Sequence, residues 1–247
     1  MQEIEIKQAK KSALVLCCPL RKSDGARFLS RECGVQGKEL SYCDCIELVK
    51  IACMKSRHDP VPLVLSMIHQ TESRGRLFLS QAPGKHLQRG RDGKAYFRDL
   101  STDLKQFLSA GISHILCLLN PSELRSIGVD PDKYSVLATE LGLRLFTYPI
   151  IEMSTPEDIS SFQLQAMQPL LDCINSGHSI LVHCRGGIGR AGLVAACALL
   201  KLEQATGPRV AIHMVRIARD RRCVESRKQE DFIALYYREV CTSLTHP

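Results

Sequence analysis

One apolar run in this chain leads directly into a glycine-rich turn that ends in arginine: Ser179-Ile-Leu-Val-His183-Cys184-Arg185-Gly186-Gly187-Ile188-Gly189-Arg190-Ala191-Gly192. Residues 180–182 predict a buried strand, and residues 192–202, apolar nearly all round, predict a buried helix. Cys184 is therefore expected where a central strand turns into a helix. A helix N-terminus and inward-pointing backbone N–H groups hold a dianion and favour thiolate over thiol.

The turn is expected to bind a phosphate group through its backbone N–H groups. The residues expected to supply this cradle are Arg185, Gly186, Gly187, Ile188 and Gly189. Arg190 can return over the cradle and hold two phosphate oxygens with its planar guanidinium, which lysine cannot do. A Cys-x5-Arg spacing alone is weak in a chain with 12 cysteines, and a buried structural cysteine is the alternative. The strand, the glycines and the helix around it favour a nucleophile.

The His-Cys-x5-Arg loop resembles that of the cysteine-dependent protein phosphatases, within them the dual-specificity branch, nearest to kinase-associated phosphatase and its relatives. The resemblance begins near residues 76–84, continues through 104–119 and 149–156, and ends near Asp231-Phe232. It implies the tyrosine and dual-specificity phosphatase fold. It also implies hydrolysis of phosphoproteins through a phosphocysteine, with phosphotyrosine as substrate and phosphoserine and phosphothreonine left open. A protein kinase is one candidate partner, and neither a metal nor an organic cofactor is needed.

A loop between the predicted strand at residues 144–148 and the cysteine carries the candidate acid. Pro156 suits the first position of a helix capped by Thr155, so the residues before it are expected to form a loop. The resemblance places a catalytic Asp where this chain has Glu152, which is one methylene longer. We expect Glu152 to protonate the leaving oxygen and then to act as the base toward water, and an ordinary solvated loop carboxylate is the alternative. Asp158 is the rival carboxylate, with capping of the helix as its expected role.

Two departures from the family pattern leave alternatives open. Ser or Thr usually follows the loop arginine and stabilises the cysteine as a leaving group, whereas Ala191 has no hydroxyl to donate. Together with Glu152, this substitution motivates a second hypothesis, a phosphate-binding pseudophosphatase with impaired turnover. A third is a phosphatase of phosphoinositides or nucleic-acid 5′-phosphates, although the loop lacks the multiple basic residues expected for a highly charged lipid head group.

Three supporting residues follow from the resemblance. It implies that His183 orders the loop from behind, although an ordinary core histidine would occupy almost the same place. Gln229 is implied to position the hydrolytic water, and Ser226 to support its loop. A simple polar helix start is the alternative for Gln229 and Ser226. The nearby arginines and Lys228 make this flank basic, or form a solvated face.

From residue 74 onward, predicted strands alternate with predicted helices. The pattern predicts an α/β fold, with a mostly parallel central sheet flanked by helices on both faces. In such sheets ligands bind at the carboxyl ends of the strands, where Cys184 is expected. We therefore assign residues 73–247 to a catalytic domain and residues 1–72 to an N-terminal extension of uncertain role, with a strand expected at residues 62–65.

Composition places further limits on function. The chain has 247 residues, a net charge of +7 and no tryptophan, which argues against a base-stacking surface, so no nucleic acid is expected. No apolar run is long enough to cross a membrane, and the N-terminus does not resemble a secretory signal. Irregular cysteine spacing favours reduced thiols and a cytoplasmic location. The cysteine cluster in residues 17–53 with His58 suggests zinc, but paired Cys-x2-4-Cys spacing is missing, so incidental thiols are preferred.

Overall fold

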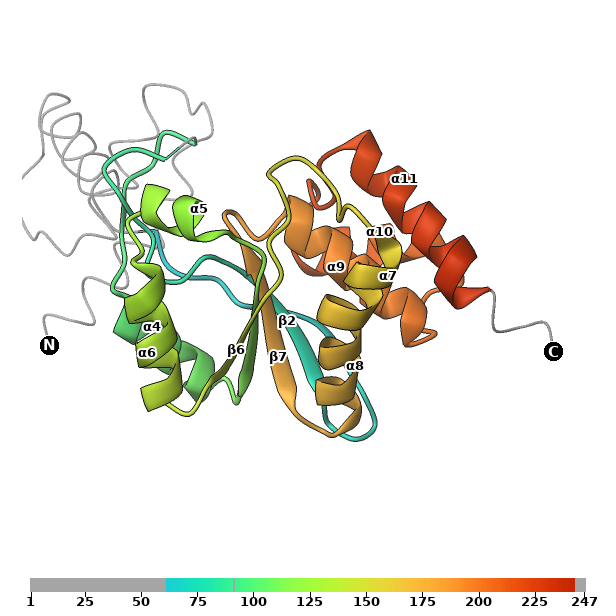
Figure 1. The fold of residues 1–247 in the computed structure, drawn as a ribbon, viewed down its shortest axis with the longest axis horizontal. Helices are drawn as coiled ribbons and strands as arrows, with labels where there is room; N and C mark the ends of the chain where they lie inside the picture. Colours follow the sequence, from blue (N-terminus) through green and yellow to red (C-terminus); the bar gives the residue numbers. More distant parts are fainter. Residues whose placement is uncertain (1–60, 91, 243–247) are drawn as a thin grey trace, which may run out of the picture. The chain divides into compact units, whose positions relative to one another are not determined.

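The computed structural model describes residues 61–90 and 92–242, and their core is a five-stranded sheet of order β1-β2-β7-β5-β6 (Figure 1). β1 pairs with β2 in antiparallel fashion, and the other neighbours are parallel. The strands are β1 (Ser66–Gln70), β2 (Arg76–Gln81), β5 (His114–Cys117), β6 (Arg144–Thr147) and β7 (Ser179–Cys184). The prediction of a mostly parallel α/β sheet is confirmed.

Helices cover both faces of the sheet (Figure 1). One face carries α4 (Leu100–Ser109), α5 (Pro121–Ser126) and α6 (Pro131–Glu140). The other face carries α8 (Gln168–Asn175), α9 (Gly189–Lys201) and α10 (Pro208–Ala218), with α11 (Arg227–Tyr236) packed on α9. The shorter elements are the hairpin β3 (His86–Leu87) and β4 (Tyr96–Phe97), the helix α7 (Ile159–Phe162) and the π-helical turns η1 (Gln163–Met167) and η2 (Tyr237–Cys241).

β7 and α9 form the centre of the molecule because their residues are apolar almost without interruption. Every residue of β7 is buried between β2 and β5. Every residue of α9 except the last is buried as well. A strand with buried neighbours on both sides, followed at once by a buried helix, fixes the position of the turn between them. Cys184 is the last residue of that strand.

The structure corrects two predictions of local structure. The strand expected at residues 62–65 lies at Ser66–Gln70, where it forms the edge of the sheet and contains an irregularity between Met67 and His69. The helix expected to start at Pro156 begins at Ile159 instead. Asp158 is its N-cap and accepts a hydrogen bond from the Ser161 N–H, because a carboxylate caps a helix more effectively than threonine.

The chain divides into two compact units, residues 1–59 and residues 60–247. Strand β1 belongs to the sheet of the second unit, although its residues lie before the predicted start of the catalytic domain at residue 73. The predictions made for residues 1–60, including the cysteine cluster and His58, lie outside the described residues. Within the described part, no helix is both long enough and apolar enough to span a bilayer.

Candidate active site

Cys184 lies at the carboxyl end of β7, at the point where the loop to α9 begins. Its side chain is almost buried, and the backbone N–H of Gly187 donates a hydrogen bond to Sγ over 3.3 Å. A backbone donor is thus directed at the sulfur, and the N-terminus of α9 starts five residues further on. The predicted arrangement of cysteine, glycine turn and helix start is therefore present.

Gly187 is the position at which the turn requires glycine. Its φ angle is +67°, and a Cβ there would lie 2.1 Å from the carbonyl oxygen of Ser80 on β2. No side chain fits in that space, and a left-handed backbone is costly for other residues. Strand β2 therefore supports the turn from beneath and sets the direction of the Gly187 N–H toward Cys184.

Arg190 is held beside the turn through one of its nitrogens. The side chain is buried in the first turn of α9, and Nη1 donates to both carboxylate oxygens of Glu123, at 2.8 and 3.0 Å. The same nitrogen donates to the carbonyl of Ile150 at 2.7 Å and lies 3.5 Å from that of Leu118. Among the described residues, nothing hydrogen-bonds to Nη2 or Nε, which leaves these two donors for a ligand.

Glu123, which sequence reasoning missed as a site residue, has two roles here. It closes a capping box at the start of α5: its backbone N–H donates to the Asn120 side chain, and its carboxylate accepts from the Asn120 N–H. It also forms the ion pair with Arg190. The pattern Asn120-Pro-Ser-Glu123 predicts the capping box. The pairing with Arg190, 67 positions further along the chain, has no local signal.

His183 lies fully buried behind Cys184, and its Nε2 is 2.9 Å from the Tyr134 hydroxyl on α6. Burial lowers the pKa of His183 to about 3, and the nearby positive charge of Arg190 lowers it further. The ring is therefore neutral and a weak base at neutral pH. It can fix the end of the strand, which agrees with the ordering role that the resemblance implies, and no described residue bonds to Nδ1.

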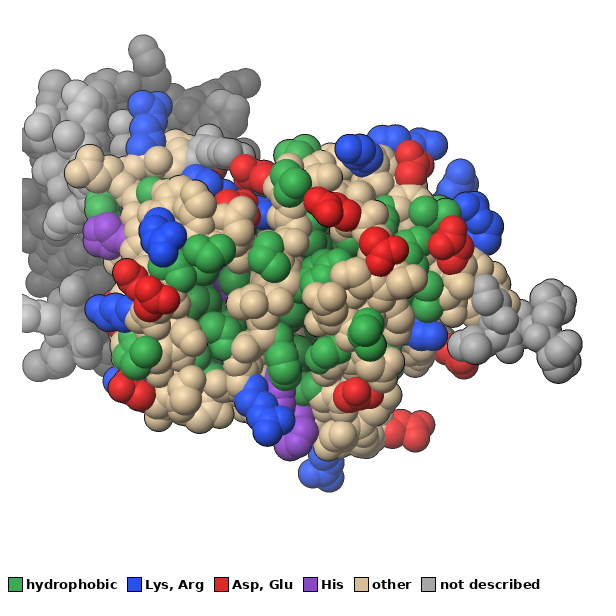
Figure 2. Space-filling view, in the orientation of Figure 1, with side chains coloured by type: hydrophobic (Ala, Val, Ile, Leu, Met, Phe, Trp, Pro, Cys, Tyr) green, Lys and Arg blue, Asp and Glu red, His purple; other side chains and the backbone are tan. Residues whose placement is uncertain are grey.

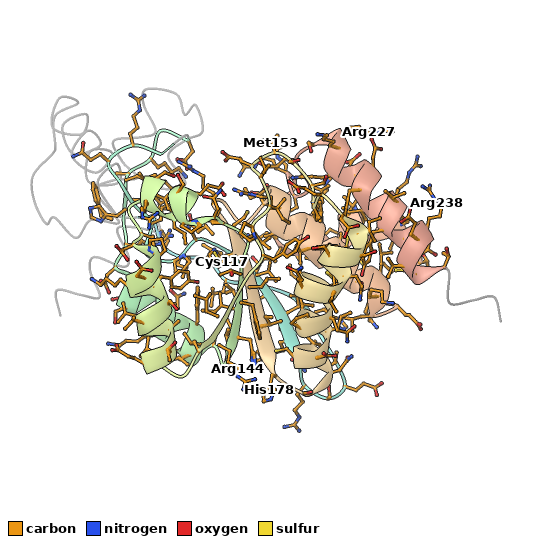
Figure 3. The ribbon with its side chains drawn as sticks, viewed as in Figure 1. Cys117, Arg144, Met153, His178, Arg227 and Arg238 are labelled. Atoms are coloured by element: carbon orange, nitrogen blue, oxygen red, sulfur yellow. The ribbon has the colours of Figure 1, made fainter. Side chains whose placement is uncertain are left out.

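Cys117 offers an internal comparison with Cys184. It ends the neighbouring strand β5, in register with His183 (Figure 3). Its thiol is directed toward the carbonyl of Leu119 at 3.6 Å, and burial raises its pKa to about 12. Two cysteines thus end adjacent strands, and the backbone around Cys117 stabilises the neutral thiol.

The loop that carries Glu152 is attached to the rest of the site at two points. The carbonyl of Ile150 accepts from Arg190, and the carbonyl of Ser154 accepts from the Gln229 side chain at 3.2 Å. Between these points the chain makes a turn closed by a hydrogen bond from the Ser154 N–H to the Ile151 carbonyl, with Met153 at φ +59°. Glu152 lies at this turn, half-buried, next to the exposed side chains of Ile151 and Met153.

Gln229 and Ser226 lie at the start of α11, as the polar helix start predicted. From there Gln229 reaches the loop that carries Glu152. Ser226 is the N-cap and accepts from the Gln229 N–H at 3.3 Å. The buried Gln229 amide joins two loops: it donates to Ser154 and accepts from the backbone N–H of Glu225 at 2.9 Å.

The basic flank contains one arginine that supports the turn. Arg219 donates to the Gly187 carbonyl at 3.2 Å and to the Val64 carbonyl at 2.8 Å. The Arg185 side chain reaches Ser126 Oγ at 3.4 Å, at the end of α5. Arg227 and Arg238 project from α11 and from the turn η2 that follows it (Figure 3), and Figure 2 shows basic and acidic side chains together on this side of the molecule. Within residues 61–90 and 92–242, no group of His, Cys, Asp and Glu side chains could hold a metal ion.

Comparison with known proteins places this geometry in a family. The sequence model described as cyclin-dependent kinase inhibitor 3 (CDKN3) matches residues 54–212, well over half of the chain. The chain belongs to the CDKN3 family. Cyclin-dependent kinase inhibitor 3 of Rattus norvegicus is 30% identical to it over 136 residues, and that of Homo sapiens 31%, covering 55% of this chain and 62% of each relative.

The CDKN3-family chain also resembles a solved structure over most of its length. Kinase-associated phosphatase, crystallised with its catalytic-site cysteine replaced by serine, aligns with a TM-score of 0.63 and 26% identity. The alignment covers 74% of this chain and 98% of that structure. The chain is therefore a member of the dual-specificity phosphatase family close to kinase-associated phosphatase, and it has the phosphatase fold.

Proposed function

We propose that this protein is a phosphoprotein phosphatase that acts through a phosphocysteine on Cys184. The observation that carries the proposal is the hydrogen bond from the Gly187 N–H to the Cys184 sulfur, beside an arginine with two unused donors. A thiolate, a backbone anion cradle and a bidentate cation are the groups needed to attack phosphorus and to stabilise the transferring phosphoryl group.

In the first step, the Cys184 thiolate forms a bond to phosphorus while the bond from phosphorus to the substrate oxygen breaks. The loop N–H groups of residues 185–189 and the free nitrogens of Arg190 hold the three phosphoryl oxygens. Glu152, in its protonated form, transfers a proton to the departing oxygen. Substrate binding brings the 151–154 turn over this oxygen, since the turn is attached to Arg190 through Ile150.

In the second step, water attacks phosphorus, the phosphorus–sulfur bond breaks, and phosphate leaves. The electron pair returns to Cys184 as thiolate, and a base takes the proton from water. Neither step requires a redox partner or a metal. The thiol must stay reduced, and the described cysteines are all free, which supports the cytoplasm as the location.

The substrate class is proposed from the relatives and from the surface around the site. The matched relatives carry the names cyclin-dependent kinase inhibitor 3 and kinase-associated phosphatase, so a phosphorylated protein kinase is the first substrate to examine. On the flank, Arg222 and Arg227 form ion pairs with Asp220 and Asp231, and Arg221 and Lys228 remain to favour phosphorylated segments with acidic neighbours. Phosphotyrosine and phosphothreonine peptides are both candidates.

The test is release of phosphate from an aryl phosphate by the purified protein, beside Cys184→Ser and Glu152→Gln. We expect Cys184→Ser to lose turnover completely. Glu152→Gln should lose about 10²-fold with substrates whose leaving group needs a proton, and much less with an activated nitrophenyl ester. Turnover that survives Cys184→Ser would refute the proposal.

One observation supports a second candidate function, a phosphate-binding protein with impaired turnover. Ala191 follows Arg190 and is fully buried, so nothing at this position can donate a hydrogen bond to the departing thiolate. The two functions differ in one measurement: the impaired protein would bind phosphopeptides and become phosphorylated on Cys184 but would release phosphate very slowly.

A further inference from the structure

The loop between α10 and α11 is built onto the phosphate-binding turn. The Val224 N–H is directed at the Ile188 carbonyl at 3.4 Å, and Arg219 holds the Gly187 carbonyl at 3.2 Å. A Cβ on Gly192 would lie 3.1 Å from the Val224 nitrogen. Hydrogen bonds therefore fix this loop to residues 187 and 188 of the turn. It also packs closely against Gly192 in the first turn of α9.

Val224 adopts a backbone conformation that is rare for its type. Its φ angle is +63°, in the left-handed region that a β-branched side chain strongly disfavours. Strain of this kind persists only where the surroundings enforce it, and it is concentrated at functional sites. The residue that follows this strained position is Glu225.

Glu225 directs its carboxylate at the catalytic turn. A Cβ built on Gly189 would lie 2.2 Å from Glu225 Oε2 and 3.3 Å from Gln229 Nε2. The carboxylate therefore occupies the space next to the first residue of α9, five positions after Cys184 and directly before Arg190. The positive end of the α9 dipole attracts a carboxylate at this place.

No hydrogen bond or ion pair within the described part of the chain involves the Glu225 carboxylate. The two arginines nearest in the sequence are paired elsewhere: Arg222 binds both oxygens of Asp220, at 3.0 and 2.9 Å, and Arg227 binds Asp231. The charge of Glu225 acts on Arg222 only as a weaker contribution that raises the arginine pKa. Gln229 accepts from the backbone N–H of Glu225 and gives one of its two amide hydrogens to Ser154. The structure thus holds the backbone of Glu225 in place and leaves its carboxylate available.

Two loops that each carry a glutamate are therefore held beside the turn, and the buried Gln229 side chain joins those loops. Glu152 lies on the loop attached through Ser154, and Glu225 lies at Gly189. The proposed reaction needs an acid in the first step and a base in the second. A single carboxylate must change protonation state between them, whereas two carboxylates can divide the tasks.

We propose that Glu225 is the catalytic base that takes the proton from the hydrolytic water, a role distinct from that of Glu152. The water attacks phosphorus, the phosphorus–sulfur bond breaks, and the proton passes to a Glu225 oxygen while the Gln229 amide, next to it, holds the water. The base offsets the absence of a hydroxyl at Ala191. This inference rests on the proposed phosphocysteine mechanism.

The test separates the two steps by rapid mixing with 4-nitrophenyl phosphate. In Glu225→Gln, nitrophenol release should keep its first-turnover burst, while the steady-state rate falls about 10²-fold. Acid quenching after exposure to ³²P-labelled substrate should recover more label on Cys184 than in the unchanged protein. Glu225→Asp should restore part of the steady-state rate. Glu203→Gln, the same change at the other end of α9, should alter neither phase.

Different failures have different meanings in this experiment. An unchanged steady-state rate in Glu225→Gln overturns the assignment of the base. A burst and a steady state that fall together also overturn it, because the residue would then act before the phosphocysteine forms. If the unchanged protein and all variants show neither a burst nor label on Cys184, the phosphocysteine mechanism itself is wrong.

Discussion

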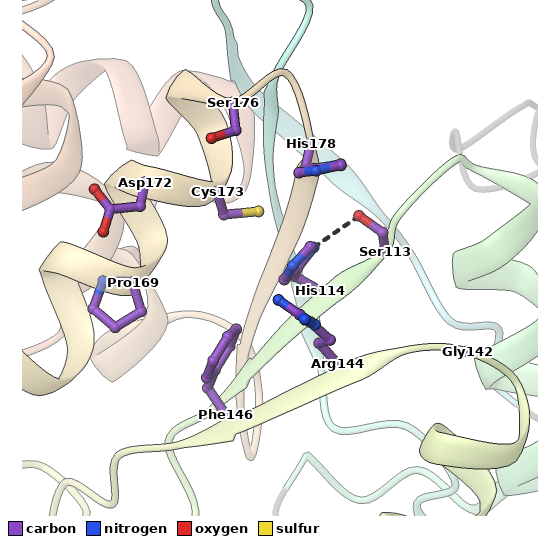
Figure 4. Close-up of a pocket in the computed structure, with 10 residues that line it drawn as sticks. All are labelled: Ser113, His114, Gly142, Arg144, Phe146, Pro169, Asp172, Cys173, Ser176 and His178. Carbon is purple, nitrogen blue, oxygen red and sulfur yellow. Dashed lines mark hydrogen bonds between the residues drawn. The ribbon is translucent and has the colours of Figure 1, made fainter.

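The two ends of the mostly parallel sheet both carry arginine side chains, yet only one end is organised to bind an anion. At the carboxyl end, Arg190 is buried and fixed through Nη1, and the N-terminus of α9 adds positive potential. At the amino end, Arg144, His114 and His178 line a cavity of about 540 Å³ (Figure 4). Figure 3 shows Arg144 and His178 at the end of the sheet opposite Met153 and Arg227.

The difference lies in the direction of the helices. α4, α6 and α8 all end at the amino edge, just before β5, β6 and β7, so the negative ends of their dipoles gather there. Arg76 illustrates the consequence, since its Nη2 donates to the Ala110 carbonyl at the end of α4 over 3.0 Å. Cations at this edge neutralise helix ends. A cavity with an arginine in its wall is therefore not in itself a phosphate site.

The largest expected effect contrasts the two arginines. Arg190→Lys should lower kcat/KM for an aryl phosphate by about 10³-fold, because an ammonium cannot hold Glu123 and two phosphoryl oxygens at once. Arg144→Lys, at the amino end, should leave kcat/KM unchanged. Steady-state kinetics on both variants provide the measurement. Comparable losses in the two variants would remove the distinction between the two ends.

The next effect concerns two glycines with positive φ angles, one at each end. Gly187→Ala should destabilise the fold by at least about 3 kcal/mol, for two reasons. Alanine would have to adopt a positive φ angle, and its Cβ would overlap the backbone of Ser80. Gly142→Ala has a similar φ of +75° but meets no atom within 4 Å, so about 1–2 kcal/mol is expected. Urea unfolding measures both values. Equal losses would mean that the contact with β2 does not constrain the turn.

A smaller effect is the pH dependence of stability from the histidines. The pKa of His183 falls from 6.5 to about 3 on folding, chiefly through burial. Below pH 6.5 the unfolded chain therefore binds a proton that the folded chain does not bind. The free energy of unfolding should fall by up to about 1.4 kcal/mol per pH unit as the pH drops from 6.5 toward 3.

The His183→Asn variant should show a flatter pH dependence of unfolding over this range. At the amino end, His114 also has a lowered pKa, through burial and then through the charges of His178 and Arg144. Because its burial is less complete, His114→Asn should flatten the dependence less. Unfolding titrations at pH 7, 6 and 5 give the comparison, and identical slopes in the two variants would contradict it.

The smallest effect tests the missing hydroxyl. Ala191→Ser should raise the steady-state rate roughly fivefold, the effect of one hydrogen bond of about 1 kcal/mol to the departing thiolate. Ala195→Ser adds the same group one turn further along α9, at another fully buried position, and should destabilise the protein without a gain in rate. An Ala191→Ser variant that turns over no faster would show that thiolate departure does not limit the reaction.

Sequence patterns predicted the elements in which local and tertiary preferences agree. Three strands and one helix lie within a few residues of their predicted places: residues 114–117, 144–147 and 179–184, and the helix that follows Cys184. In these segments the apolar run and the glycine that ends it favour the same element. The errors occur where the signals compete. Residues 62–65 look more strand-like than Ser66–Gln70, yet the polar segment forms the edge strand, where exposure is tolerated.

The candidate site was predictable to the extent that it is local. Cys184, the glycines and Arg190 lie within one short stretch, so spacing and residue type place them together. Glu123, Tyr134 and Glu225 come from α5, α6 and the loop before α11, and the folded sheet alone brings them to the turn. Nothing in their own neighbourhoods of the sequence indicates which residue they will meet.

Residues 62–66 precede most of the sheet and connect it to distant parts of the chain. Gln81 binds the carbonyl of Pro62, Gln106 that of Leu63, and Arg219 that of Val64. Arg219 also holds the carbonyl of Gly187. A shortened version of the protein that began at β1 would remove three hydrogen-bond acceptors, and Arg219 would keep only Ser66 and Gly187 as partners. Truncations designed for crystallisation or assay should therefore keep Pro62 and the residues after it.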